Sequence, residues 1–419
     1  MPDSNSPPIT RRALVASAAG AIGGVVFGDM AAAGQANQGT VTPAPAVPND
    51  PTAVPGLASG PLGARSKFES PALAPSGVVA GASFTPLHLL SGTITPSDLH
   101  FQRHHNGIAQ IDPARYQLLV HGLVDRPIVF TLDELKRFPP VSRTHFIECA
   151  GNGRAAFRAP KREMTPQQTD GLVSNTEWTG VPLATLLREV GVRRGASWFL
   201  AEGGDAARMS RSVPIEKAMD DALIAYAQNG EPLRPANGYP VRLVLPGFEG
   251  NTSVKWLRRI ELIDQPNMSR DETSKYTDPL PNETARQFSF VMDAKSVITS
   301  PAHPMRLSGA GWWPVSGVAW SGRGRITRVD VSADGARTWA AAELEEPVLP
   351  KAFTRFHMMW RWDGRPARLV SRAVDETGYE QPTVARFRDS RGAGTDYHFN
   401  ALRAWDVDAS GAVFLAVEP

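Results

Sequence analysis

The chain has 419 residues, of which 42% are hydrophobic, a formal net charge of +2 at pH 7 and a single cysteine. Its length is enough for two globular domains, and the small net charge gives no reason to propose a nucleic acid or an anionic membrane as a partner. One cysteine excludes a disulfide within the chain, a zinc site of the usual paired pattern and an iron–sulfur cluster held by four protein thiolates.

Residues 1–33 have the order of a twin-arginine export signal. Arg11 and Arg12 precede an apolar stretch rich in Ala and Gly that ends in small residues near residue 33. The stretch is too short and too weakly hydrophobic for a membrane span. The sequence therefore predicts periplasmic localisation through this pathway, which carries proteins that fold before export, often around a cofactor. The alternative is a disordered tail with a chance arginine pair.

Residues 34–83 are dominated by Pro, Ala, Gly and Ser and are interpreted as a linker or extended arm. Residues 84–265 then combine helical and strand patterns, which predicts a mixed α/β domain. Thr131 and Glu134 have the spacing of a capping box that opens a short helix. The other expected elements are helices over residues 182–190 and 215–226 and strands over residues 116–122, 239–245 and 254–262.

A segment rich in proline and polar residues, 266–286, connects this domain to a C-terminal part of different character. Residues 287–419 contain short alternating segments with turn signals, such as 326–335 and 367–374, which favour an antiparallel β-sandwich. The predicted fold class is thus α+β, a mixed α/β domain followed by a sandwich.

The single cysteine, Cys149, follows an apolar run typical of a strand and precedes a loop that ends at Arg154. A cysteine at a strand end beside flexible backbone, His145 and Arg154 can be held as a thiolate. Two alternatives remain at this point. The thiol could be an inert buried hydrophobe, or a nucleophile paired with a histidine.

Five motifs, taken in chain order, resemble the sulfite oxidase family of molybdenum enzymes over roughly residue 84 to the C-terminus. They are residues 98–105 (Asp-Leu-His-Phe-Gln-Arg-His-His), 149–154 (Cys-Ala-Gly-Asn-Gly-Arg), 237–242 (Asn-Gly-Tyr-Pro-Val-Arg), 254–257 (Val-Lys-Trp-Leu) and 275–276 (Lys-Tyr). Residues 103–105 and 201–205 are most similar to the molybdenum subunits of sulfane dehydrogenases of the Sox sulfur-oxidation system. The resemblance implies an immunoglobulin-like sandwich that mediates dimerisation.

The resemblance also implies a molybdenum-molybdopterin cofactor with Cys149 as the only protein ligand of the metal, a role that suits a soft thiolate. Asn237 stands where sulfite oxidases commonly carry histidine. Arg242 and Lys255 are the candidates for the cofactor phosphate, and their alternative is a solvated strand face or a structural ion pair. The full set of implied cofactor-binding residues is Phe101, Gln102, Arg103, His104, His105, Cys149, Arg154, Asp205, Asn237, Arg242, Ser253, Val254 and Lys255.

For catalysis, Arg103 and Tyr276 match the family's substrate-pocket arginine and tyrosine, beside Cys149. Arg103 would bind an anionic sulfur group, and Tyr276 would couple proton movement to electron transfer. Arg355 is a further candidate that would reach the pocket from the second domain. A surface arginine on a strand is the alternative for this residue.

The expected reaction is oxidation of sulfane sulfur held on a carrier protein during thiosulfate oxidation. The sequence has no haem-attachment motif and no dinucleotide-binding fingerprint, so electrons are expected to pass to a c-type cytochrome subunit. Two alternatives remain. The enzymatic one is oxidation of free sulfite, and the non-enzymatic one is an exported β-sandwich module for binding or assembly with an inactive cofactor domain.

The expected assembly is a homodimer through the C-terminal domain or a heterotetramer with the cytochrome. Trp312, Trp313 and Trp320 are available for interface contacts, and ordinary core packing is their alternative.

Overall fold

The computed structural model describes residues 58–280, 282–392 and 394–417. The chain divides into two units, Met1–Ala64 and Arg65–Pro419, and every helix and strand given below lies in the second. The expected export signal and the first part of the expected linker lie outside the described residues. The predicted domain boundaries stay predictions. No helix among the described residues is long and apolar enough to cross a membrane.

The strand that leads to Cys149 belongs to an antiparallel sheet in the N-terminal half. Its order is β11-β10-β7-β6, and β12 also pairs with β10. The strands are β6 (Val141–Glu148), β7 (Val173–Pro182), β10 (Leu223–Gln228), β11 (Glu231–Pro232) and β12 (Arg242–Val244). Because β6 ends at Glu148, this sheet fixes where Cys149 leaves the strand.

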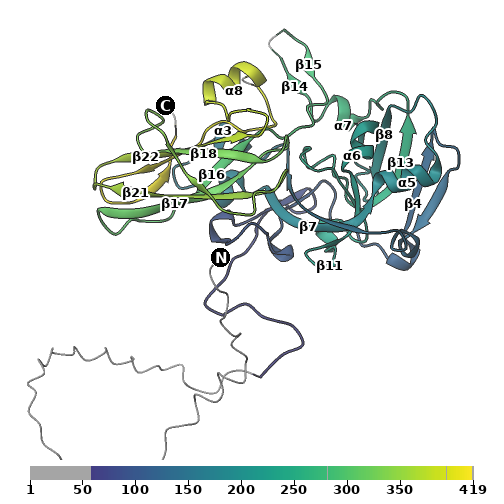
Figure 1. The fold of residues 1–419 in the computed structure, drawn as a ribbon, viewed down its shortest axis with the longest axis horizontal. Coiled ribbons are helices and arrows are strands. Elements are labelled where there is room, and N and C mark those ends of the chain that lie inside the picture. The colour runs from purple at the N-terminus through teal and green to yellow at the C-terminus, as the bar shows by residue number, and fades with distance from the viewer. Residues whose placement is uncertain (1–57, 281, 393, 418–419) are drawn as a thin grey trace, which may run out of the picture. The chain divides into compact units, whose positions relative to one another are not determined.

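A second sheet of this half has the order β5-β4-β13-β8-β9, with β4 and β13 parallel and the other pairs antiparallel. Its strands are β4 (Gln117–Gly122), β5 (Ile128–Thr131), β8 (Trp198–Gly203), β9 (Ser210–Pro214) and β13 (Leu257–Ile263). One apolar core joins this sheet to β7, β10, β12 and helix α5 (Leu183–Val190). In Figure 1, β4, β8 and β13 lie at the right, on the same side as α5.

The helix predictions are partly confirmed. The capping box is present at α2 (Leu132–Leu135), where the Thr131 side chain accepts from the Glu134 amide and Glu134 reaches back to Thr131. The helix expected over 182–190 is α5. The prediction of one helix over 215–226 is wrong, because α6 (Ile215–Asp220) ends at Asp220 and β10 begins at Leu223. Pairing of β10 with β7 and β12 overrides the helical periodicity, since both faces of β10 find apolar partners.

The strand predictions around the cavity described below were too long. Strand β12 begins only at Arg242, after Pro240, which has no amide hydrogen to donate. Strand β13 begins at Leu257, because Lys255 and Trp256 leave the strand path and Trp256 has φ +52°. The predicted strand over residues 116–122 is confirmed as β4.

A three-stranded sheet, β1-β2-β3, carries Arg103. Its strands are β1 (Ala74–Ser76), β2 (Gly81–Phe84) and β3 (Gln102–His104). Strand β1 and most of β2 lie within the segment expected to be a linker or extended arm. They need no core of their own, because β2 pairs with β3 and its backbone groups are satisfied there.

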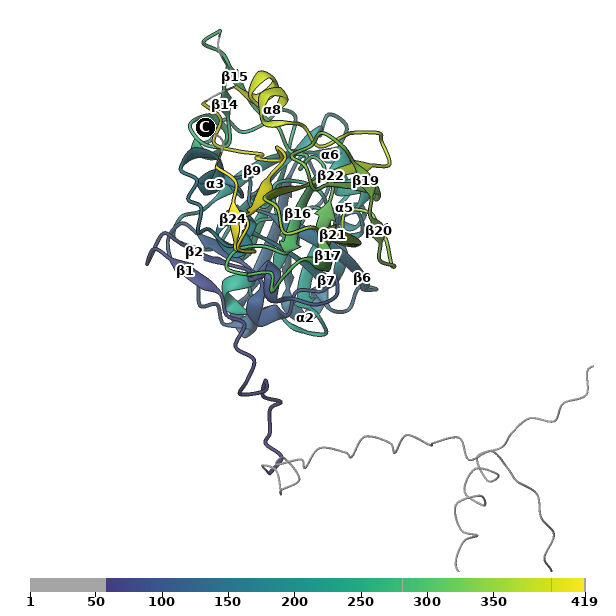
Figure 2. The ribbon, with the colours of Figure 1, turned by 90° about the vertical axis from the view of Figure 1, so that its left-hand side faces the viewer.

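The C-terminal half is a sandwich of two antiparallel sheets, ordered β16-β17-β21-β20 and β19-β18-β22-β23-β24. Figure 2 faces these strands. The predicted segments 326–335 and 367–374 correspond to β18 and β22. The strands are β16 (Lys295–Ser300), β17 (Gly311–Trp320), β18 (Ile326–Ser332), β19 (Ala340–Ala341), β20 (Glu343–Leu344), β21 (Thr354–Trp362), β22 (Ala367–Asp375), β23 (Ala404–Val407) and β24 (Val413–Leu415).

The three tryptophans singled out from the sequence separate by exposure. Trp320 is fully buried, Trp313 packs against the sandwich core and Trp312 is 64% exposed. Core packing thus accounts for Trp320.

The remaining elements are short. They are α3 (Arg154–Arg158), α4 (Pro166–Asp170), α7 (Arg270–Thr273), α8 (Val384–Arg391), β14 (Asp278–Pro279), β15 (Ala285–Arg286) and the 3-10 helices η1 (Leu87–Leu89), η2 (Ser97–Leu99), η3 (Pro113–Arg115) and η4 (Pro235–Asn237).

Candidate active site

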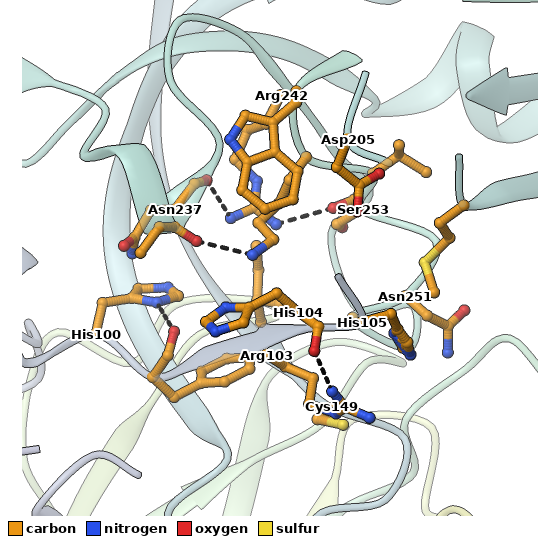
Figure 3. A pocket seen from close by; sticks show the side chains of 18 of the residues that line it. His100, Arg103, His104, His105, Cys149, Asp205, Asn237, Arg242, Asn251 and Ser253 are labelled. Atoms are coloured by element: carbon orange, nitrogen blue, oxygen red, sulfur yellow. Dashed lines mark hydrogen bonds between the residues drawn. The ribbon is translucent and has the colours of Figure 1, made fainter. Parts of the chain in front are cut away.

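A cavity with about 730 Å³ of empty space, part of it open to solvent, lies between β3, the loop after β6, η4 and the segment before β13. Figure 3 shows Cys149 and Arg103 at one end and Arg242 with Ser253 at the other. The structure brings most of the predicted site residues together here. Those that line the cavity are Phe101, Arg103, His104, His105, Cys149, Asp205, Asn237, Arg242, Ser253, Val254, Lys255 and Tyr276.

Cys149 is only partly buried, and it lines both this cavity and a second one that adjoins it. Its amide donates to the Leu172 carbonyl over 2.9 Å, which anchors the start of the loop. Burial raises the pKa of the Cys149 thiol, while the Gly151 amide and the charges of Arg103 and Arg154 favour the thiolate. The thiol is therefore not sealed in hydrocarbon, and it faces cations that suit an anionic ligand group.

The far end of the cavity holds two cations, the buried Arg242 and the half-buried Lys255, and Asp205 lies near enough to Lys255 to interact with its charge without forming an ion pair. The guanidinium of Arg242 donates to the carbonyls of Asn237 and Ser253, each over 2.9 Å, and the ammonium of Lys255 donates to the Ala236 carbonyl over 2.8 Å. Among the described residues, no carboxylate forms an ion pair with either one. Burial lowers the pKa of Arg242 to about 9 and that of Lys255 to about 7. Such a pair is costly unless an anion binds between them.

Several buried polar atoms of the cavity also lack a hydrogen-bond partner in the described chain. They are His100 Nε2, His104 Nδ1, Asn237 Nδ2 and Asn251 Nδ2. Burial lowers the pKa of His100 to about 3 and that of His104 to about 4, so both imidazoles are neutral at pH 7. Neutral donors and acceptors beside two unpaired cations fit a ligand with a polar ring system and a phosphate.

At the Cys149 end, Arg103, His105 and Tyr276 form the wall that the two cavities share. Arg103 Nη1 donates to the carbonyls of His104 over 2.5 Å and Gly81 over 3.2 Å, which holds the guanidinium in place. Tyr276 Oη lies 3.3 Å from His105 Nε2, and burial raises the pKa of Tyr276. This end combines a fixed cation with a protonated phenol and an imidazole.

Three predicted residues do not line this cavity. Arg154 lies in the second cavity and donates to the Asp396 carbonyl over 2.8 Å. Gln102 pairs with Ser83 in the small sheet and lines neither cavity among the described residues. Arg355 also lines neither, because it sits on β21 and donates to the carbonyls of Leu90, over 2.6 Å, and Gly92. The expectation that Arg355 reaches the pocket is corrected by this placement.

Sequence reasoning missed several residues of the cavity. His100 precedes Phe101 inside a quoted motif, and Trp256 follows Lys255 inside another, so both could have been found there. Asn251 carried no such signal. Asn251 accepts a hydrogen bond from the buried Arg211. The guanidinium of Arg211 also pairs with Glu249 over 3.0 Å and lies 4.9 Å from the centre of the Tyr276 ring. Because Arg211 and Tyr276 are far from Asn251 in the chain, no local spacing predicts the network.

Two family models match the two halves. One is described as an oxidoreductase molybdopterin binding domain and matches residues 105–271. The other is described as a Mo-co oxidoreductase dimerisation domain and matches residues 286–403. The fold is thus that of a molybdopterin-binding oxidoreductase with an immunoglobulin-like β-sandwich, as predicted, and its cofactor is molybdenum-molybdopterin.

Solved and curated relatives agree. The sulfane dehydrogenase SoxCD from Paracoccus pantotrophus superposes with a TM-score of 0.85 at 46% identity, covering 88% of this chain and 96% of that one. NADH nitrate reductases from Solanum lycopersicum and Arabidopsis thaliana are 34% and 33% identical over 70% of this chain, which spans 36% of their length. The chain belongs to the sulfite oxidase family of molybdenum enzymes. Within that family it is a molybdenum oxidoreductase similar to sulfane dehydrogenase.

Proposed function

We propose that this protein oxidises sulfane sulfur bound to a carrier protein during thiosulfate oxidation. The observation that carries the proposal is the second cavity, which extends from Cys149 and Arg103 to the exposed residues Arg270 and Lys275. The cavity opens to solvent at this end, so the sulfur-bearing segment of a carrier protein can approach Cys149 from outside. The cationic side chains of Arg103, Arg270 and Lys275 line its path.

The inner cavity holds the cofactor in this proposal. Arg242 and Lys255 bind its phosphate, and the unpaired atoms of His100, His104 and Asn237 bind its ring system. Cys149 supplies the protein sulfur that ligates the metal. When bound, the cofactor supplies two-electron redox and oxygen-transfer chemistry.

The residues around Cys149 bind the substrate and manage its protons. Arg103, Arg270 and Lys275 have no ion-pair partner among the described residues, so they attract and hold an anionic sulfur group. Arg103 lies deepest and orients the reacting sulfur. Tyr276 stays protonated because burial raises its pKa, and its Oη and His105 Nε2 form a short path for a proton leaving the site.

The proposed setting is the periplasm, reached by the twin-arginine signal expected in residues 1–33, with a c-type cytochrome as electron acceptor. Dimerisation is proposed through the outer face of β17 and β21. Trp312 and Met359 are 64% and 54% exposed there, and Pro314, also exposed, pairs with Met359. An exposed apolar patch of this kind is typical of an interface.

The test measures cytochrome c reduction by the purified full chain with carrier already loaded with sulfane sulfur, with unloaded carrier, and with free sulfite. The proposal expects rapid reduction only with the loaded carrier. A double substitution, Arg270→Glu with Lys275→Glu, should lower carrier-dependent kcat/KM by about tenfold or more, whereas Arg115→Glu, an exposed arginine outside both cavities, should not. Rapid turnover of free sulfite without the carrier would instead support a sulfite dehydrogenase. Purified protein without molybdenum would support the non-enzymatic alternative.

A further inference from the structure

A buried cluster of four charges joins the sandwich to the residue that precedes Cys149. Glu148 and Asp170 come from the N-terminal half, and Lys295 and Arg403 come from the C-terminal half. The ammonium of Lys295 lies 2.8 Å from Asp170 Oδ1 and 3.3 Å from Glu148 Oε1, and Arg403 Nε lies 2.9 Å from Asp170 Oδ2. Glu148, Asp170 and Lys295 are each at most 2% exposed.

The Glu148 carboxylate receives two further hydrogen bonds. The indole of Trp320, on β17 of the sandwich, donates to Oε2 over 2.7 Å, and Asn152 donates to Oε1 over 2.9 Å. Asn152 belongs to the Cys149 loop itself and also accepts from the Leu172 amide over 3.0 Å. Cys149 therefore lies in the chain between Glu148 and Asn152, whose side chains are hydrogen-bonded to each other. The Glu148 carboxylate is also held by Lys295 and Trp320 of the sandwich.

The rest of the loop has a second tie to the C-terminal half. The amide of His398 donates to the Ala150 carbonyl over 2.8 Å. Each of the four charges has an opposite charge within 3.3 Å, and separating buried charges is costly, so the cluster has little freedom to shift while the domains stay packed. A side chain that ligates a metal needs this kind of support, because small displacements at a reacting centre cost rate.

We propose that Lys295 and Trp320 are positioning residues for Cys149, so that the C-terminal domain sets the geometry of the metal ligand in addition to mediating association. This inference rests on the proposed role of Cys149. Trp320 acts through Glu148 and does not line either cavity.

Trp320→Phe tests the proposal more specifically than Lys295→Met. Lys295→Met would leave two buried carboxylates short of a cation and would threaten folding itself. Trp320→Phe removes one donor and keeps an aromatic ring, while Glu148 retains Lys295 and Asn152. Trp405→Phe is the matched control. Trp405 is also a buried tryptophan of the sandwich, and its indole donates to the Ile298 carbonyl over 3.1 Å, away from the Cys149 loop.

Two readouts apply to both variants. Cys149 is the only thiol of the full chain, so its alkylation rate in cofactor-free protein reports directly on the loop. Trp320→Phe should speed alkylation about threefold or more and, in the loaded enzyme at equal molybdenum content, lower kcat about tenfold with little change in KM. Trp405→Phe should match the wild type in both, with a comparable loss of thermal stability.

The proposal is overturned if Trp320→Phe alkylates at the wild-type rate, or if both variants accelerate equally, since either result indicates only a general stabilising role. Wild-type protein without molybdenum would refute the proposed function, yet it would leave the alkylation comparison intact. The two failures are therefore distinguishable.

Discussion

Replacing Lys255 by methionine should stabilise the cofactor-free protein and weaken cofactor retention at the same time. In the cofactor-free chain the Lys255 side chain is half-buried, its ammonium donates to the Ala236 carbonyl, and repulsion from Arg242 outweighs the attraction of Asp205. Methionine fills similar space without a charge. A bound phosphate reverses the balance, because it supplies the missing anion.

The free-energy penalty of the charged Lys255 in the folded protein follows from its pKa. This pKa falls from 10.5 to about 7, chiefly by burial and then by repulsion from Arg242. At about 1.4 kcal/mol for each tenfold change in proton affinity, the penalty is about 5 kcal/mol as an upper figure. This penalty is fully present below pH 7. It falls between pH 7 and 10.5, because only the folded state loses the proton in this range, and it is absent above pH 10.5. Cofactor-free wild-type protein should therefore gain stability as pH rises through this window.

The assay is denaturant unfolding of cofactor-free protein at pH 7 and at pH 9, together with molybdenum content after expression with the cofactor available. Lys255→Met should be more stable than the wild type at pH 7, show less gain with pH and retain little metal. Lys351→Met is the control, since the Lys351 ammonium lies 2.6 Å from Asp221 and outside both cavities, and the loss of this ion pair should destabilise the fold. A Lys255→Met protein that is destabilised to the same extent and binds molybdenum normally would refute the reasoning.

Four further outcomes are expected. Cys149→Ser should lose sulfur oxidation while its melting temperature stays within about 3 °C of the wild type, because oxygen is a poorer donor than thiolate to this metal; unchanged turnover would reject the ligand role. Arg103→Met should lower kcat/KM about 100-fold in steady-state kinetics through loss of charge-assisted contacts to the anionic substrate, and a loss below threefold would contradict that assignment. Tyr276→Phe, which removes only the hydroxyl near His105, should lower kcat about tenfold at constant metal content; a wild-type kcat would exclude the proton path. Trp312→Glu should weaken self-association about tenfold or more in analytical ultracentrifugation, whereas an unchanged dimer would move the interface away from β17.

The sequence predicted the fold where local patterns and tertiary packing agree. Thr131 and Glu134 form their capping box within one turn, and the strands at residues 116–122 and 367–374 alternate as sheets require. The helix over residues 215–226 failed because its second half has apolar neighbours on both sides, an environment that the periodicity of one segment does not reveal.

For the site residues, too, local sequence patterns predict only part of the arrangement. Residues such as Arg242 and Lys255 were found because they lie in short motifs of the family, and the structure brings them to one cavity. The expectation for Arg355 was wrong because nothing in its local sequence shows that its guanidinium donates to the carbonyls of Leu90 and Gly92. The contacts of Lys295 with Glu148 and Asp170 span more than one hundred residues, so only the folded chain reveals them.

The most direct measurement is metal and pterin analysis of native protein combined with X-ray absorption at the molybdenum edge, for the wild type and for Cys149→Ser. The account predicts stoichiometric molybdenum with molybdopterin in the wild type, and a sulfur neighbour of the metal that is lost in the variant. Absent metal, or identical sulfur coordination in both proteins, would contradict it.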